Sequence, residues 1–172
     1  MTSEPDKDVF TTLKTTMGNN KNLKIGQINI NGLASKLTDI QFLLKEVEFT
    51  ETHLTEDISN ELIRILGHNM VRRDRSNGSK GGGVVIYYRD NLNIFEDLKW
   101  NIHQDFEAVW LNITIRSQST LLGCLYRPPK STMFYSDLHD LLNKIWVKRK
   151  NVILLGDFNC NVLANTADTV IE

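Results

Sequence analysis

The feature that most constrains the fold of this chain is an apolar run that leads directly into a polar turn. Residues 152–155 read Val-Ile-Leu-Leu, and residues 156–159 read Gly-Asp-Phe-Asn. Aliphatic and β-branched residues closed by a glycine are typical of a buried strand in a sheet. Because side chains alternate along a strand, Asp157 and Asn159 are expected on one side and Phe158 on the other. Taken alone, the segment also fits an ordinary turn after a core strand, since Asp and Asn favour turns.

Strand-like and helix-like patterns alternate through the rest of the chain. Apolar residues recur at helical spacing in residues 33–46, in a short stretch at 59–66, and in residues 134–146. Ser59 is the expected cap of the second helix and Gly67 its expected end. Strands mixed with helices predict an α/β fold in which helices lie on both sides of packed sheets. The strand-like runs are residues 23–30, 84–88, 108–115, 121–126 and 152–155.

Length and composition predict one soluble globular domain. The chain has 172 residues, 41% of them hydrophobic and 24% charged, with a formal net charge of −1. No apolar stretch approaches the roughly 18 residues needed to span a bilayer, and the polar N-terminus does not resemble a signal peptide. We therefore expect a soluble, intracellular protein with no membrane partner. Residues 1–22 lack an apolar period and predict a flexible leader, which leaves residues 23–172 for the domain.

Four short polar segments occur in a characteristic order. They are Gln-Ile-Asn-Ile-Asn-Gly at residues 27–32, Thr-Glu-Thr-His-Leu at 50–54, Tyr-Arg-Pro-Pro at 126–129, and the Gly-Asp-Phe-Asn turn. In this order and spacing they resemble the endonuclease/exonuclease/phosphatase superfamily, most closely the endonuclease domain of non-LTR retrotransposons. The resemblance implies a deoxyribonuclease-like, four-layer α/β sandwich with two packed mixed sheets flanked by helices. It also implies Mg²⁺-dependent hydrolysis of phosphodiester bonds, with Mn²⁺ as an alternative metal, and DNA as the partner.

The resemblance also assigns roles to five residues. Glu51 matches the family's metal-binding glutamate, and Asn29 matches an asparagine that supports the metal site and contacts phosphate. Asp157 matches the aspartate that orients attacking water, Asn159 would donate to a phosphate oxygen, and Tyr126 matches a tyrosine of the active-site network. Mg²⁺ needs only one or two carboxylates in addition to water and substrate phosphate, so this set is chemically sufficient.

Each of these residues also has a purely structural explanation. Asn29 fits the end of a strand, Glu51 fits a solvated charge, and Tyr126 fits a core residue whose hydroxyl is satisfied by a neighbour. Basic residues near the motifs form a candidate surface for DNA phosphates or, alternatively, an exposed charged loop. The four histidines stand in no catalytic pattern and are expected to be structural or surface residues. The basic residues are Arg72, Arg73, Arg75, Lys80 and Arg127.

Two departures from the family pattern bear on activity. The superfamily continues beyond the aspartate motif to an Asp-His pair, whose histidine acts as general base or as its electrostatic partner, and the 172 residues contain no such pair. We therefore expect a partial, incomplete sandwich that lacks its C-terminal part. Weak or no hydrolysis should follow, since loss of a general base costs roughly 10²–10⁴-fold in rate. The second departure is that the predicted helix at residues 33–46 almost reaches Glu51, without the family's apolar strand. This predicts either a displaced Glu51 or a helix that unwinds to reach the site.

Three functions remain open on this basis. The first is a retrotransposon-type, Mg²⁺-dependent DNA endonuclease domain that is weak or inactive in this chain. The second is a non-catalytic remnant that binds nucleic acid weakly through its basic loop. The third is another phosphoesterase of the same superfamily, acting on lipid or sugar phosphates. No small-molecule cofactor beyond the metal is expected, and a nuclear location follows from the resemblance alone.

Overall fold

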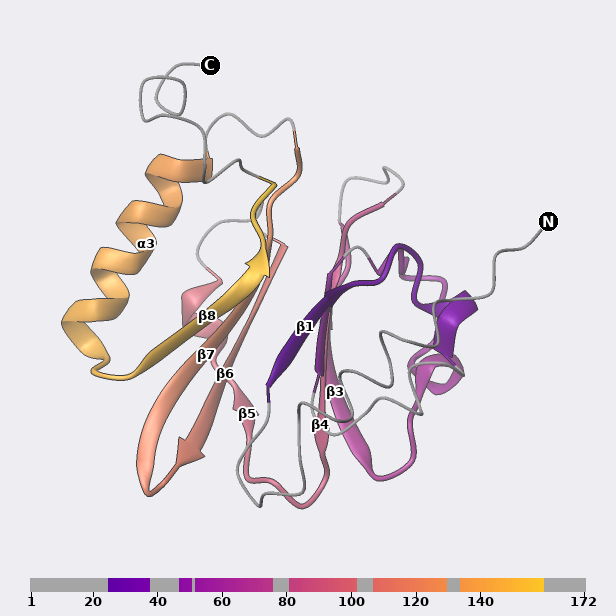
Figure 1. The fold of residues 1–172 in the computed structure, drawn as a ribbon, viewed down its shortest axis with the longest axis horizontal. Helices are drawn as coiled ribbons and strands as arrows, with labels where there is room; N and C mark the ends of the chain where they lie inside the picture. The colour runs from indigo at the N-terminus through magenta and orange to yellow at the C-terminus, as the bar shows by residue number, and fades with distance from the viewer. Residues whose placement is uncertain are drawn as a thin grey trace, which may run out of the picture.

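Two β-sheets pack face to face, with further layers outside each sheet (Figure 1). The structure is a computed structural model, and it describes residues 25–37, 47–50, 52–75, 81–101, 107–129 and 134–159. Within these ranges each sheet has four strands. None of the helices in the same ranges has the length and apolar character needed to cross a membrane.

The first sheet has the strand order β1-β2-β4-β3. β1 and β2 are parallel, and the other two pairings are antiparallel. The register sets Asn29 beside Thr50, and Thr50 beside Val84. The carboxyl ends of β1 and β2 therefore meet the start of β4 at one end of the sheet. The strands are β1 (Gly26–Asn29), β2 (Val47–Thr50), β3 (His68–Arg73) and β4 (Val84–Arg89).

The second sheet has the strand order β5-β6-β7-β8. β6 and β7 form a hairpin whose turn residues, Arg116 and Ser117, have φ angles of 48° and 65°, as a two-residue hairpin turn requires. β8 runs parallel to β7, so Tyr126 lies between Glu107 and Asp157 in the ladder. The strands are β5 (Phe95–Glu96), β6 (Glu107–Ile115), β7 (Gln118–Tyr126) and β8 (Val152–Asp157).

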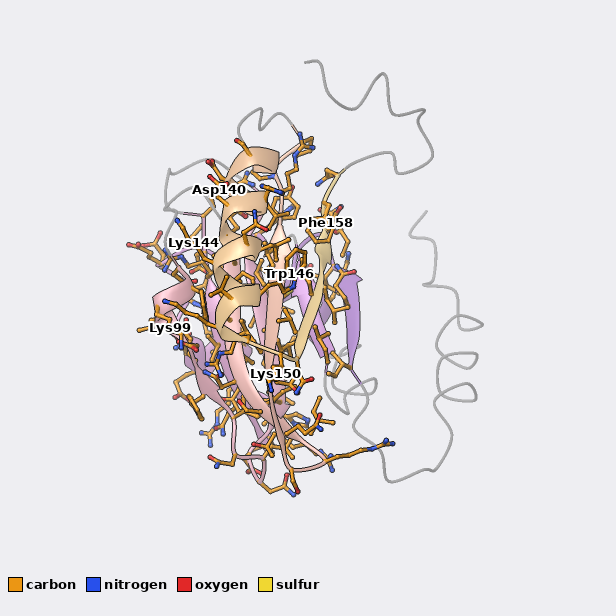
Figure 2. The ribbon with its side chains drawn as sticks, turned by 90° about the vertical axis from the view of Figure 1, so that its left-hand side faces the viewer. Lys99, Asp140, Lys144, Trp146, Lys150 and Phe158 are labelled. Atoms are coloured by element: carbon orange, nitrogen blue, oxygen red, sulfur yellow. The ribbon has the colours of Figure 1, made fainter. Side chains whose placement is uncertain are left out.

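Apolar side chains from both sheets form the central core. The other face of the second sheet is covered by α3 (Phe134–Lys148), which Figure 2 views from outside. Leu138, Leu141 and Ile145 recur at three- and four-residue spacing on α3, and all three are buried against the sheet. The residues buried between the sheets are Val84, Ile86, Val109, Leu111, Ile113, Leu122, Cys124 and Tyr126.

Short turns cover the outer face of the first sheet in the described part of the chain. η1 (Ala34–Lys36) and η2 (Asn60–Ile63) are 3-10 helices, and a third, η3 (Leu98–Trp100), packs near α3. The two sheets, α3 and this outer layer confirm the predicted α/β sandwich of two mixed sheets flanked by helices. The side chains of the outer layer are Leu33, Leu54, Ile63 and Ile65, which pack with Val85 and Tyr87 of β4.

Most predicted elements are confirmed by these bounds. The runs at residues 84–88, 108–115, 121–126 and 152–155 are β4, β6, β7 and β8. The first predicted strand is β1 over its described part, and the predicted helix at residues 134–146 is α3. The expected leader and most of the first predicted helix lie outside the described residues, so these predictions stand untested.

β2 corrects the expectation that a helix almost reaches Glu51. Residues 47–50 form a strand between β1 and β4. Their sequence, Val-Glu-Phe-Thr, alternates apolar and polar residues, which is the period of a strand. The strand that was expected to be missing before Glu51 is therefore present, and it sets Thr50 beside Asn29. A displaced Glu51 no longer follows from the sequence. Glu51 itself lies outside the described residues.

Other stretches also differ from the sequence prediction, and β5 is one of them, since no strand was expected at residues 95–96. Residues 60–63 form the 3-10 turn η2 instead of a longer amphipathic helix, and Ser59 makes no side-chain capping bond. Leu62 and Leu66 are exposed, so the helical apolar pattern does not correspond to a buried face. β3 was not predicted, because its mainly polar sequence at the edge of the described sheet carries little strand signal.

Candidate active site

The carboxyl ends of β1 and β8 meet at one end of the two sheets. We call this end the rim and define it by Asn29, Tyr126, Asp157 and Asn159. Asn29 Nδ2 donates a hydrogen bond of 2.9 Å to Asp157 Oδ2, across 128 positions of sequence. Asn29 ends β1 and Asp157 ends β8, so each side chain is carried by a paired strand. The fold thus brings together two residues to which the family resemblance assigns roles at the metal and the attacking water.

Asp157 is oriented by three hydrogen bonds in addition to its place in β8. Its Oδ2 accepts from Asn29, its Oδ1 accepts from the Asn159 backbone N–H at 3.1 Å, and its backbone oxygen accepts from the Arg127 N–H at 2.9 Å. Gly156 precedes it with a φ of 153°, and a Cβ there would overlap the Leu125 carbonyl oxygen. Glycine therefore lets β8 approach β7 closely just before the carboxylate.

Asn159 and Arg127 close the turn that follows β8. Asn159 Nδ2 donates to the Arg127 backbone oxygen at 2.8 Å, and Arg127 Nη1 donates to the Asn159 backbone oxygen at 2.9 Å. Asn159 has a φ of 44° and lies beyond the strand, so strand alternation does not determine its side-chain direction. Phe158 packs against the core between α3 and the second sheet. The side chains of Asp157 and Asn159 both lie at the rim, and each is hydrogen-bonded to a backbone group there.

Tyr126 lies next to Asp157 in the β7–β8 register and is 3% exposed. Its ring belongs to the core between the sheets. The guanidinium carbon of Arg75 lies 5.7 Å from the ring centroid, and the Arg75 side chain is also hydrogen-bonded to Tyr126. Tyr126 thus has the buried ring of a core residue and a polar end beside the rim carboxylate.

A buried ion pair joins the two sheets on the other side of Tyr126. Arg75 Nε donates to Glu107 Oε1 at 2.5 Å, and the Gly83 backbone N–H donates to Glu107 Oε2 at 2.5 Å. The Arg75 and Glu107 side chains are 15% and 9% exposed. Burial acts to lower the pKa of Arg75, but the hydrogen bond and charge of Glu107, together with Tyr126, outweigh it and raise the pKa. Arg75 is therefore a charged group fixed inside the protein.

The remaining basic candidates are dispersed. Arg72 Nη1 donates to the Ile58 carbonyl oxygen at 2.8 Å, and Arg72 Nη2 lies 3.2 Å from Asp74 Oδ2. Ile58 packs in the outer layer of the first sheet, so the Arg72 side chain is directed away from the space between the sheets. Arg73 is half-buried at the end of β3, and Lys80 lies outside the described residues. Contact of these residues with nucleic acid stays a prediction.

A comparison with family models decides the classification. A model of the Endonuclease/Exonuclease/phosphatase family matches residues 26–167, a range that includes both Asn29 and Asp157. The chain belongs to this family. No curated protein sequence shows a significant match to this chain.

Solved structures share the fold of this family member at low sequence identity. The endonuclease domain of TRAS1, a telomere-specific non-LTR retrotransposon, matches with a TM-score of 0.54 at 12% identity, over 78% of this chain and 58% of its own. The catalytic domain of Xenopus laevis APE2 matches with 0.54 at 17%, over 80% and 59%. D. rerio TDP2, complexed with single strand DNA product, matches with 0.53 at 16%, over 83% and 62%. The chain thus spans about three-fifths of the length of each.

Members of the endonuclease/exonuclease/phosphatase family generally depend on a divalent metal, and the rim offers suitable ligands. Among the described residues no cluster of three or more His, Cys, Asp or Glu side chains is arranged around a metal position. The rim donors are the Asp157 carboxylate and Asn29 Oδ1, which is left over because Nδ2 takes the bond to Asp157. Both are hard oxygen ligands, and Asn29 is exposed, so Mg²⁺ could keep its waters there. These residues fit such a metal, and Glu51 would be a further carboxylate.

Glu107 was not among the residues expected at the site. A Cβ on Gly82 would overlap the Arg75 guanidinium and the Glu107 carboxylate, so this glycine leaves room for the ion pair. One available signal was an acidic residue directly before the apolar run of β6, and another was the Gly-Gly-Gly at residues 81–83. Neither signal identifies Arg75 as the partner.

A shallow hollow of about 350 Å³ lies at the opposite end of the second sheet. It surrounds the start of β8, whereas Asp157 ends that strand. The hollow is therefore separate from the rim. Its lining includes Ile115, Arg116, Gln118, Thr120, Lys150 and Ile153.

Proposed function

We propose that the rim is the active site of a retrotransposon-type, divalent-metal-dependent DNA endonuclease domain. The observation that carries the proposal is the 2.9 Å hydrogen bond between Asn29 and Asp157, which joins the ends of β1 and β8. An exposed carboxamide and a carboxylate at the ends of two strands form a site that a hydrated cation and a phosphate can both reach. Membership in the endonuclease/exonuclease/phosphatase family supports hydrolysis of a phosphate ester as the reaction.

The rim residues take distinct parts in this proposal. The Asp157 carboxylate, oriented by Asn29 and by the Asn159 N–H, accepts a hydrogen bond from the attacking water and directs it at phosphorus. The Asn159 side chain and the Tyr126 hydroxyl donate to phosphate oxygens, where negative charge develops. A bound Mg²⁺ or Mn²⁺ would polarise the phosphate and support charge on the leaving oxygen. Glu51 and Asn29 would hold that ion.

DNA is proposed as the substrate on two grounds. The Tyr-Arg-Pro-Pro turn and the Arg-rich approach to the glycines at residues 81–83 resemble retrotransposon endonucleases. The structures that share the fold include the TRAS1 endonuclease domain and a TDP2 complex with single strand DNA product. A mannosyl-6-phosphatase of Bacteroides thetaiotaomicron shares the fold as well, so sugar phosphates belong among the substrates tested.

Nicking of supercoiled plasmid tests the proposal directly. We expect weak nicking that needs Mg²⁺ or Mn²⁺, stops with a chelator, and falls roughly 10²–10⁴-fold in Asp157→Ala. Asp140→Ala is the matched control, because Asp140 is an exposed aspartate on α3. Nicking that persists in Asp157→Ala or with chelator would assign the activity elsewhere, and faster release of phosphate from sugar phosphates than from DNA would change the substrate.

Metal binding provides a second readout that needs no turnover. Mn²⁺ is paramagnetic, so at low concentration it should broaden the amide signals of Asp157 and Asn159 in an NMR spectrum before those of α3. Asp157→Ala should weaken this selective broadening, because it removes the hydrogen bond that orients Asn29, a proposed ligand of the ion. A chain that shows neither selective broadening nor nicking would not carry the proposed site.

A further inference from the structure

We propose that Arg75, held in place by Glu107, positions the Tyr126 hydroxyl so that its proton points to a phosphate oxygen bound beside Asp157. Arg75 is thus a positioning residue that acts through Tyr126. The role given to the phosphate rests on the proposed function, whereas the coupling of Arg75 to Tyr126 does not.

Glu107 holds the Arg75 side chain in place. Glu107 uses one oxygen for Arg75 Nε and the other for the Gly83 N–H, and both charged side chains are largely buried. A buried carboxylate that lost its partner would be left uncompensated, which is strongly unfavourable. Arg75 therefore does not leave Glu107 to meet an anion in solvent. Arg75 thus differs from a mobile surface arginine that contacts the phosphates of nucleic acid.

The glycines at the start of β4 belong to the same arrangement. Gly82 has a φ of 76°, and a Cβ at this position would overlap the guanidinium of Arg75 and the carboxylate of Glu107. Gly83 brings its own N–H to Glu107. Residues from β6, from the end of β3 and from the approach to β4 thus meet around one ion pair. A contact of this kind fixes the position of the guanidinium relative to both sheets.

The fixed Arg75 guanidinium orients the neighbouring Tyr126 hydroxyl. Arg75 lies over the Tyr126 ring, with 5.7 Å between the guanidinium carbon and the ring centroid, and is hydrogen-bonded to Tyr126. A guanidinium has only donors, so the Tyr126 oxygen must accept from it. The O–H of Tyr126 then points away from the guanidinium. Arg75 therefore makes Tyr126 a donor on the side away from the ion pair.

The Tyr126 side chain lies beside Asp157. In the second sheet Tyr126 stands directly between Glu107 on β6 and Asp157 on β8. Neighbouring strands are about 4.8 Å apart, so Tyr126 and Asp157 can contact the same phosphate group. Arg75, Tyr126 and Asp157 form a row across the rim, with the fixed cation at one end. An O–H aimed at a phosphate oxygen beside Asp157 stabilises charge where the reaction develops it.

The coupling is tested by ¹⁹F NMR of the chain labelled with 3-fluorotyrosine. The Tyr126 signal is identified by its loss in Tyr126→Phe. In Arg75→Lys we expect this signal to move toward the shift of an exposed tyrosine, because an ammonium does not reproduce the planar fork. Arg64→Gln is the control, since Arg64 forms an exposed pair with Glu61 on η2, and it should leave the Tyr126 signal unchanged.

A double substitution guards against failure to fold. Arg75→Met combined with Glu107→Gln removes both buried charges together and so leaves neither unpaired. It should also move the Tyr126 signal. A folded protein, with either the single or the double substitution, whose Tyr126 signal matches that of the wild type overturns the proposal, whatever the nicking assay gives.

Kinetics on a short duplex then separate positioning from general stability. Where the wild type cleaves, Arg75→Lys should lower kcat by up to about a hundredfold with little change in KM, because the donor is misplaced. In a Tyr126→Phe background the same substitution should have no further effect. Equal losses with and without the hydroxyl would show that Arg75 acts on structure alone. A wild type without metal-dependent cleavage counts against the proposed function, while the ¹⁹F result still decides the coupling.

Discussion

Asn29 and Asp157 join the two sheets at one side of the rim through a single hydrogen bond, whereas Arg75 and Glu107 join them at the other side through a buried ion pair. Asn29 is exposed, while the side chains of Arg75 and Glu107 are 15% and 9% exposed. The first contact lies between β1 and β8, each of which is an edge strand of its sheet in the described part of the chain. The second involves the inner strand β6 and the loop that leads to β4.

This difference shows how one surface can combine a stable frame with a site open to ligands. A hydrogen bond between exposed groups exchanges with water at little cost, so a cation or phosphate can take its place. A buried ion pair has no such exchange partner, so its loss affects the whole fold. We therefore expect substitutions at the Arg75 end to affect stability first, and substitutions at the Asn29 end to affect chemistry first.

The largest expected effect is that of Glu107→Ala. It leaves Arg75 charged and unpaired and the Gly83 N–H without its acceptor, so the free energy of unfolding should fall by about 3–5 kcal/mol. Urea denaturation measures this value. Glu61→Ala, which removes the exposed partner of Arg64, should change it by less than about 1 kcal/mol. Similar losses in both variants would mean that the buried pair is no stronger a connection than a surface pair.

A pair of glycine substitutions ranks next. Gly82 and Gly67 both have a φ of 76°, but a Cβ meets the ion pair at Gly82 and nothing within 4 Å at Gly67. Gly67→Ala should therefore cost only the backbone strain, about 1–2 kcal/mol. Gly82→Ala should cost about 1–3 kcal/mol more, because the ion pair must shift. Equal melting temperatures for the two variants would show that the pair tolerates displacement.

Asp97 extends the comparison to a third carboxylate, on the α3 side of the second sheet. It accepts from Asn112 Nδ2 and Arg149 Nη2, each at 2.8 Å, and lies 2.9 Å from Lys99 Nζ. Burial acts to raise the pKa of Asp97, but the hydrogen bonds from Asn112, Lys99 and Arg149 outweigh it and lower the pKa. Asp97 therefore resembles Glu107 as a bonded, largely buried carboxylate.

The lowered pKa of Asp97 predicts a pH dependence of stability. Its contribution is complete above the ordinary pKa of an aspartate and is lost as the pH falls through the lowered folded value. Asp97→Asn should lower the free energy of unfolding near neutral pH and flatten its decline as the pH falls below about 5. Urea denaturation at several pH values measures both. Parallel curves for the variant and the wild type would contradict the assignment.

The smallest effect on stability is expected at the open end of the rim. Asn29→Ala removes one exposed hydrogen bond, so the free energy of unfolding should change by less than about 1 kcal/mol. The same substitution should lower metal-dependent nicking or Mn²⁺ affinity roughly 10–100-fold, because Asn29 orients the carboxylate. A large loss of stability without a change in metal binding would reverse the comparison between the two ends.

Local sequence patterns predicted most of the fold, because the central strands and α3 bury regular apolar faces. The runs that became β6, β7 and β8 needed no distant partner to be recognised. β3 was missed, since a polar strand at the edge of the described sheet has no such pattern. β2 was missed because its four residues directly follow the predicted helix at residues 33–46 and are too few for a clear strand pattern. Its pairing with β1 and β4 identifies it as a strand.

The candidate site was predictable only in part. Family resemblance placed Asn29 and Asp157 together, and the structure confirms their contact. Arg75 was instead expected on a surface that contacts phosphate, yet it pairs with Glu107, 32 positions away. No periodicity links an arginine in a charged stretch to a glutamate at the start of a strand. Burial of both groups in one place is a property of the packed sheets, so it appears only in three dimensions.

The 128-residue separation of Asn29 and Asp157 has a consequence for synthesis of the protein. A ribosome adds roughly 5–20 residues per second, so Asp157 is made on the order of ten seconds after Asn29. During this interval β1 to β7 are translated before β8, the strand that completes the contact. The nascent chain therefore holds an asparagine without its carboxylate, and nucleic acid near the ribosome meets no assembled site until β8 docks beside β7.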